Sequence, residues 1–156
     1  MVCLLLIRSW GMRGMATMKP EEIGRNRKRK VLIVDDNEDL ASVIAALLEF
    51  DGYEVRLARD SDNGYQAYIL FQPHLVITDI QMPGKNGLEL IGDIRAHDPK
   101  VKTIYMSADL GRFHALLEDE IERYQVVLLQ KPFSTTELRG LLSKLLSDAV
   151  HEKSEV

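Results

Sequence analysis

The 156-residue sequence has a single cysteine and no long apolar run. Cys3 cannot form an internal disulfide, so nothing indicates a disulfide-rich secreted protein. The apolar run at residues 2–7 is too short to span a membrane, and no basic residue precedes it as in a signal peptide. We therefore expect a soluble, cytoplasmic protein that has no membrane partner.

The sequence also lacks a zinc-ligand pattern and a low-complexity composition. The histidines at positions 74, 97, 114 and 151 show no close ligand spacing, so no structural zinc site is expected. With 10 Gly, 5 Pro and 46% apolar residues, the chain is neither collagen-like nor disordered, and it should bury a hydrophobic core. Its length suits one domain.

The net charge of −4 is unevenly distributed along the chain. Residues 1–30 carry 8 basic and 2 acidic side chains, whereas residues 31–156 carry 12 basic and 22 acidic ones. An acidic body has no overall positive field that attracts phosphates, so general nucleic-acid binding is not expected. One alternative stays open, a nucleic-acid adaptor that uses the basic residues of this arm, Arg25, Arg27, Lys28, Arg29 and Lys30.

These patterns divide the chain into three parts. Residues 1–30 are predicted to be a basic N-terminal extension outside the folded domain, either a tail that precedes a later biological start or a functional arm. Residues 31–147 are predicted to form the domain, and residues 148–156 a polar C-terminal tail.

Short apolar runs alternate with amphipathic segments from residue 31 onward. Strands are predicted at 31–34, 54–58, 75–78, 103–107 and 126–130, and helices at about 38–50, 61–71, 88–97 and 111–124, with a last one that opens at a capping box of Ser134 and Glu137. Five strands that alternate with five helices predict an α/β fold, a doubly wound parallel sheet covered on both faces.

The helix ends and apolar faces carry more detailed expectations. Ser61 is predicted to cap the second helix, and Gly52 to stand at the C-terminal cap of the first. In strand 54–58 the alternation places Val55 and Leu57 on one face. The apolar stripe predicted for the first helix consists of Leu40, Val43, Ile44, Leu47 and Leu48.

Polar side chains stand at the ends of four predicted strands. Asp35 and Asp36 follow the first strand, and Asp79 follows the third. Ser107 ends the fourth strand and Lys131 follows the fifth. Because ligands of such sheets bind beyond the carboxyl ends of the strands, these side chains should converge. A divalent cation relieves the repulsion among carboxylates, and a lysine and a hydroxyl suit phosphoryl oxygens, so the set predicts metal-assisted phosphoryl transfer onto a carboxylate.

Four segments resemble the receiver domains of two-component response regulators: VLIVDDNED, LVITDIQMPGKNG, YMSAD and LLQKPF. The resemblance covers about residues 31–147 and implies the flavodoxin-like fold with strand order 2-1-3-4-5. It implies a receiver that is no enzyme beyond its own phosphorylation and dephosphorylation. Because the sequence leaves little beside the receiver, we expect a stand-alone receiver that signals through an unknown downstream protein.

The resemblance also implies a role for each site residue. Asp79 looks like the phosphoacceptor, which receives a phosphoryl group from a histidine kinase or a histidine phosphotransfer protein. Asp36, Asp79 and the backbone carbonyl of Gln81 would ligate Mg²⁺, and Asp35 would act through a bound water. The Lys131–Pro132 bond resembles the cis peptide of the family.

Other positions bear on how the signal is sent. Lys131 would pair with one phosphoryl oxygen, and Ser107 would hydrogen-bond another, which would bias the following loop and helix toward a partner-binding state. Gln81 and Asp109 stand where the family tunes loss of the phosphoryl group. Many receivers carry Tyr or Phe three residues before the lysine, whereas here Leu128 has no hydroxyl that could exchange partners.

Two further alternatives remain at this stage. The chain could be the receiver part of a hybrid histidine kinase. It could also be a haloacid-type phosphatase, but that family places a second carboxylate two residues beyond the nucleophile, where Gln81 stands here.

Overall fold

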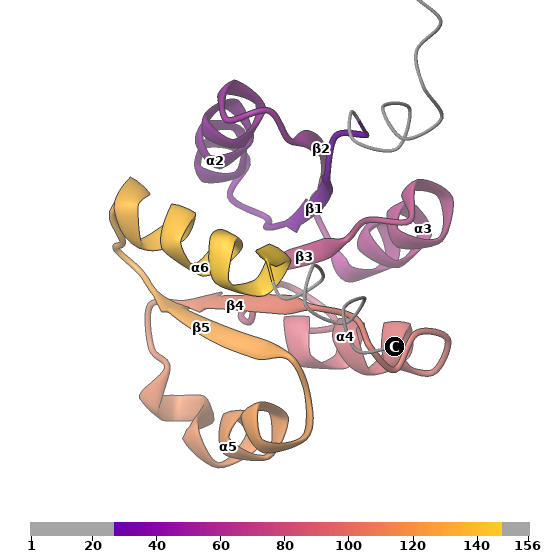
Figure 1. Ribbon diagram of the computed structural model, residues 1–156. Coiled ribbons are helices and arrows are strands. Elements are labelled where there is room, and N and C mark those ends of the chain that lie inside the picture. The colour runs from indigo at the N-terminus through magenta and orange to yellow at the C-terminus, as the bar shows by residue number, and fades with distance from the viewer. Residues whose placement is uncertain (1–26, 148–156) are drawn as a thin grey trace, which may run out of the picture.

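The computed structural model describes residues 27–147 (Figure 1). The predictions made for residues 1–26 and 148–156 lie outside the described residues. Strands and helices alternate in the order β1 (Lys30–Val34), α2 (Glu38–Phe50), β2 (Glu54–Ala58), α3 (Ser61–Phe71), β3 (Leu75–Asp79), α4 (Gly87–Arg95), β4 (Thr103–Ser107), the 3₁₀ helix η1 (Gly111–Phe113), α5 (His114–Arg123), β5 (Val126–Gln130) and α6 (Thr135–Ser147).

The five strands form one parallel sheet in the order β2-β1-β3-β4-β5, which confirms the predicted fold class and strand order. Helices α2 and α6 pack on one face of the sheet, and α3, α4 and α5 pack on the other (Figure 1). Within the described part of the chain, no helix combines the length and apolarity that a membrane crossing requires.

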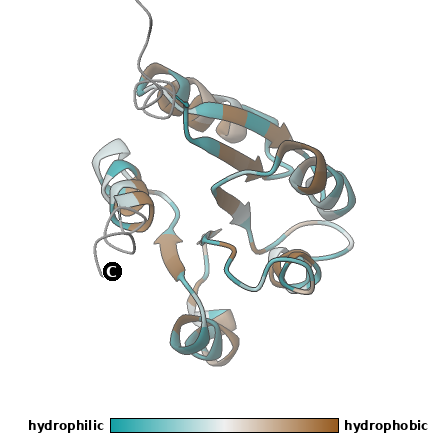
Figure 2. Cartoon of the chain, turned by 45° about the vertical axis from the view of Figure 1, so that its right-hand side comes forward, coloured by the Kyte–Doolittle hydropathy of each residue, from teal (hydrophilic) through white to brown (hydrophobic). Residues whose placement is uncertain are grey.

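The central strands are buried because helices cover both of their faces. In β1, Val31 and Ile33 contribute to the core under α2 and α6, whereas Leu32 and Val34 contribute to the core under α3, α4 and α5. All four side chains are fully buried, which explains why the strand is continuously apolar rather than alternating. Figure 2 shows hydrophobic residues concentrated in the strands, with both kinds of residue on the helices.

Two helix ends follow the predicted chemistry. The Ser134 hydroxyl accepts a hydrogen bond from the backbone amide of Glu137, and the Glu137 carboxylate accepts one from the backbone amide of Ser134. This capping box confirms the predicted start of the last helix. Gly52 follows the last turn of α2 with φ of +96°, a left-handed conformation that glycine adopts without steric cost.

The predicted cap of the second helix is wrong. Asp60, not Ser61, caps α3, because the Asp60 side chain accepts a hydrogen bond from the backbone amide of Asn63. Ser61 is the first helical residue and is buried. Its hydroxyl donates to the carbonyl of Lys85, a residue 24 positions away that local pattern could not identify.

Two predicted apolar faces are only partly buried. Val43 is 67% exposed, and α2 buries the small residues Ala41 and Ala45 instead. Leu57 is 43% exposed because β2 is an edge strand with a neighbour on one side only.

Several element boundaries differ from the prediction by a few residues. β1 begins at Lys30, so the last residue of the predicted extension belongs to the sheet, and the third helix spans 87–95 rather than 88–97. The segment predicted as one helix at 111–124 consists of η1 followed by α5.

Helix α4 begins very close to the end of β3, and this contact generates a prediction. A Cβ atom at Gly87 would lie 2.2 Å from the backbone oxygen of Asp79, whereas one at Gly92 in the same helix would meet nothing within 4 Å. We expect Gly87→Ala to lower the free energy of unfolding by about 2 kcal/mol, because backbone atoms must shift. Gly92→Ala should raise it by about 0.5–1 kcal/mol, since alanine favours a helix. Urea unfolding of both variants measures the difference, and equal effects would contradict the steric explanation.

Candidate functional site

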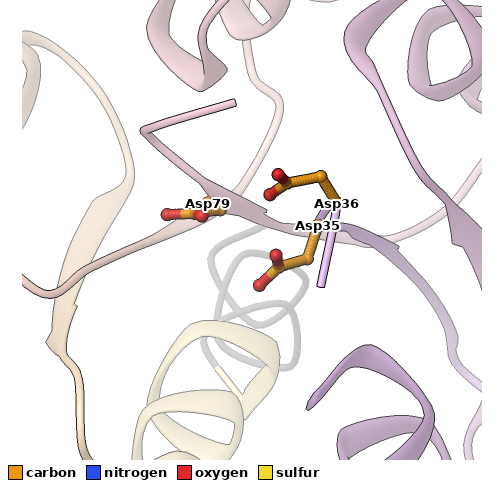
Figure 3. A group of neighbouring side chains, drawn as sticks. All are labelled: Asp35, Asp36 and Asp79. Atoms are coloured by element: carbon orange, nitrogen blue, oxygen red, sulfur yellow. The ribbon is translucent and has the colours of Figure 1, made fainter. Parts of the chain in front are cut away.

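Three carboxylates meet at the carboxyl ends of β1 and β3 (Figure 3). Asp35 and Asp36 directly follow β1, and Asp79 is the last residue of β3. The parallel register pairs Val34 with Thr78, which sets the residues that follow side by side. One carboxylate oxygen from each aspartate lies within 4.8 Å of the others. The predicted convergence of these three residues is therefore observed.

Lys131 completes the cluster from the end of β5, two strands away from β3. Its Nζ atom lies 3.0 Å from Oδ2 of Asp35 and 3.4 Å from Oδ2 of Asp79. Its backbone amide donates to the carbonyl of Ser107 over 2.8 Å, which extends the pairing of β4 with β5 to the site. The peptide bond between Lys131 and Pro132 is cis, as the resemblance implied.

The cluster concentrates negative charge at a partly buried position. Asp35 and Asp79 are 1% and 8% exposed, whereas Asp36 is open to solvent. Burial raises the pKa of Asp79; the charge of Asp35 adds to the rise, while Lys131 and a hydrogen bond from the Gln81 backbone oppose it. Three carboxylates thus face one ammonium group.

This donor set fits a hard divalent cation. Carboxylate oxygens are ligands that Mg²⁺ prefers, and one or two of them usually suffice alongside water and phosphate oxygens. The excess of carboxylates over ammonium groups is the charge that such an ion would balance.

The other predicted site residues stand at the same edge with different contacts. Ser107 is fully buried, and its Oγ accepts a hydrogen bond from the backbone amide of Asp109 over 3.0 Å. The Asp109 carboxylate in turn accepts from the backbone amide of Arg112, so these residues shape the loop that leads into α5. Gln81 is exposed, two residues beyond Asp79. The structure does not test the predicted metal contact of its backbone carbonyl.

Two residues that support Asp79 were not identified from the sequence. The Thr78 hydroxyl donates to the backbone carbonyl of Asp79 over 3.0 Å, and Gly87 packs against the same carbonyl. The available signal was Asn86 followed by glycine before an apolar periodic run. In the structure Asn86 caps α4 in a capping box with Glu89.

Comparison with known proteins gives a consistent family. Residues 31–143 match the response regulator receiver domain family. The chain is 33% identical over 132 residues to YesN of Bacillus subtilis, an uncharacterized transcriptional regulatory protein; the match covers 80% of this chain and 35% of YesN. It is 32% identical over 118 residues to Protein CcdB of the same species, covering 75% of this chain and 97% of CcdB. The chain also covers 52% of RprY of Bacteroides fragilis, so it spans less than two thirds of YesN and RprY.

Solved structures agree with this family. The response regulator TrrA of Thermotoga maritima, in complex with Mg²⁺-BeF, is 28% identical with a TM-score of 0.66; 75% of this chain and 98% of that chain are covered. A response regulator receiver domain protein of Clostridium thermocellum is 26% identical with a TM-score of 0.68; 78% of this chain and 96% of that chain are covered.

The concentrated charge generates a prediction about Asp79. In EDTA, Asp79→Asn should raise the free energy of unfolding, because the change removes a desolvated charge that repels Asp35. Added Mg²⁺ should stabilise the wild type, by about 2.7 kcal/mol at roughly 100 times the dissociation constant, and the variant much less.

Thermal unfolding with and without Mg²⁺ measures both effects. Asp62→Asn serves as the control, because Asp62 is an exposed carboxylate of α3 outside the cluster. If the Asp79 variant and the control respond equally to Mg²⁺, the cluster is not a metal site.

Proposed function

The chain belongs to the response regulator receiver family, and from this premise we propose that Asp79 accepts a phosphoryl group from a phosphohistidine. Receiver domains are signalling modules that take phosphoryl groups from histidine kinases and act on downstream targets. The phosphodonor of this chain is a histidine kinase or a histidine phosphotransfer protein. The observation that carries the proposal is the buried Asp79 carboxylate, with Lys131 and two further carboxylates beside it.

The transfer is a substitution at phosphorus. An oxygen of Asp79 attacks the phosphorus atom, the phosphorus–nitrogen bond of the phosphohistidine breaks, and its electron pair returns to the imidazole. The product is an acyl phosphate on Asp79. Burial raises the pKa of Asp79, which indicates that its charge is poorly solvated.

Other residues of the chain position the group and balance its charge. Asp36, Asp79 and the backbone carbonyl of Gln81 would hold Mg²⁺, with Asp35 acting through a bound water, and the ion supplies positive charge against the phosphoryl oxygens. Lys131, which lies 3.4 Å from Asp79, presents its ammonium group to a phosphoryl oxygen. Ser107 turns its hydroxyl toward another phosphoryl oxygen.

We propose further that the modified chain signals in the cytoplasm by contact with a separate protein, as a stand-alone receiver. The similarity to CcdB, of which the chain covers 97%, supports this reading. The surface of α5 is the proposed contact, because Leu116 and Ile121 are 60% and 46% exposed there. This helix directly follows the loop that Ser107 and Asp109 shape.

Phosphorylation from a small-molecule donor tests the proposal. Incubation with acetyl phosphate and Mg²⁺ should add one phosphoryl group to the wild type, seen by intact mass, and no group should be added when EDTA replaces Mg²⁺. Asp79→Ala should gain none, because the nucleophile is lost, whereas Asp62→Asn should behave as the wild type does. A wild type that gains no group, or an Asp79→Ala variant that gains it equally, would exclude Asp79 as the phosphoacceptor.

A further inference from the structure

Tyr105 of β4 is a buried aromatic residue, and it lies beside Leu128, the position at which this chain has no aromatic residue. The register of β4 and β5 pairs Tyr105 with Leu128, the residue that has no hydroxyl to exchange partners. Tyr105 is fully buried and stands two residues before Ser107, so both side chains lie on the same face of β4. A phenolic hydroxyl is therefore present one strand away from the expected position.

The Tyr105 hydroxyl belongs to a polar cluster that joins three elements. It donates to Oε2 of Glu120 on α5 over 3.0 Å. Both terminal nitrogens of Arg95, the last residue of α4, donate to the same carboxylate over 2.8 and 2.6 Å. The Arg95 and Glu120 side chains are only 9% and 16% exposed. Such a bidentate pair is geometrically specific, and it is hard to replace once its charges are away from water.

Two further features keep this cluster in one arrangement. The guanidinium group of Arg95 lies 3.5 Å from the ring centroid of Tyr124, the residue that follows α5. Burial and the charge of Glu120 raise the pKa of Tyr105, so its hydroxyl stays a hydrogen-bond donor at all physiological pH values.

Helix α5 depends on this cluster because it has little apolar attachment. Leu117 is the one buried residue of α5, whereas α4 buries Gly87, Leu90, Ile91 and Ile94. Glu120 is one helical turn beyond Leu117 and so faces the same side. Within α5, the inward-facing attachment to the sheet therefore consists mainly of Leu117 and the carboxylate of Glu120, while Phe113 and Tyr124 pack at its two ends.

We propose that Arg95, Glu120 and Tyr105 form a latch. The latch holds α5 in the position that it has when Asp79 is unphosphorylated, and it thereby opposes phosphorylation of Asp79. The proposal rests on the proposed function. In this arrangement Ser107 accepts from the Asp109 amide, at the start of the loop that leads into α5. When the Ser107 hydroxyl turns to a phosphoryl oxygen, that bond is lost, the loop shifts, and Glu120 on α5 separates from Arg95 and Tyr105.

Coupling of this kind must act in both directions. If the closed latch weakens phosphoryl binding at Asp79, then phosphoryl binding must weaken the closed latch by the same factor. A variant that cannot close the latch should therefore bind a phosphoryl group more tightly. We expect Glu120→Gln and Tyr105→Phe to bind beryllofluoride, a phosphoryl mimic, about fivefold or more tightly than the wild type in the presence of Mg²⁺. Amide hydrogen exchange in α5 should also become faster in both variants without beryllofluoride, while that in β1 and β3 stays unchanged.

Asp51→Asn is the matched control for these variants. Asp51 also forms a bidentate ion pair, with Arg139 of α6, over 2.7 and 3.0 Å on the other face of the sheet. An ion pair that serves stability alone predicts that no variant binds beryllofluoride more tightly. Tyr105→Phe loses only one oxygen atom, so its affinity for beryllofluoride still tests the latch if Glu120→Gln does not fold.

The outcomes separate the two proposals. If the wild type binds beryllofluoride and the latch variants bind it no more tightly, the latch is wrong and the phosphoacceptor assignment stands. If the latch variants and the Asp51 control gain affinity equally, the effect is general loosening and the latch is again wrong. If the wild type does not bind beryllofluoride with Mg²⁺, both proposals are overturned.

Discussion

The backbone pairing of parallel strands is the constraint on which the rest of this structure depends. It brings the carboxyl ends of all five strands to one edge, so residues far apart in the chain become neighbours there. Asp35 and Asp79 are 44 positions apart in sequence, yet they follow paired residues of β1 and β3. Main-chain hydrogen bonds between strands thus assemble a site that no single segment contains.

This assembly places mutually repelling charges in a partly buried position, and the surrounding structure is built to tolerate them. Lys131 reaches Asp35 and Asp79 from the end of β5. The close approach of Gly87 and the hydroxyl of Thr78 hold the backbone at Asp79. Two apolar layers stabilise the sheet on either side, so the site can remain electrostatically unfavourable while the fold persists.

The two helices beside the site on one face are attached in different ways. Four buried residues fix α4 to the sheet, whereas α5 is held by Leu117 and a polar cluster. Apolar packing changes little with the charge at a distant residue, but ion pairs and hydrogen bonds depend on geometry. A helix that is attached mainly through polar contacts is therefore suited to respond when the loop before it changes.

Local pattern in the sequence determined the alternation of strands and helices, the capping box at Ser134, and the polar residues at the strand ends. These features depend on neighbours within a few positions, and the motifs around Asp79 and Lys131 were sufficient to name the family. Only the tertiary structure decided that Ser61 is buried against Lys85 instead of capping α3, that Val43 faces solvent, and that Glu120 joins Arg95 and Tyr105. The partners in that last cluster stand 15 and 25 positions apart, and no periodicity in a sequence records which side chains meet when separate elements pack.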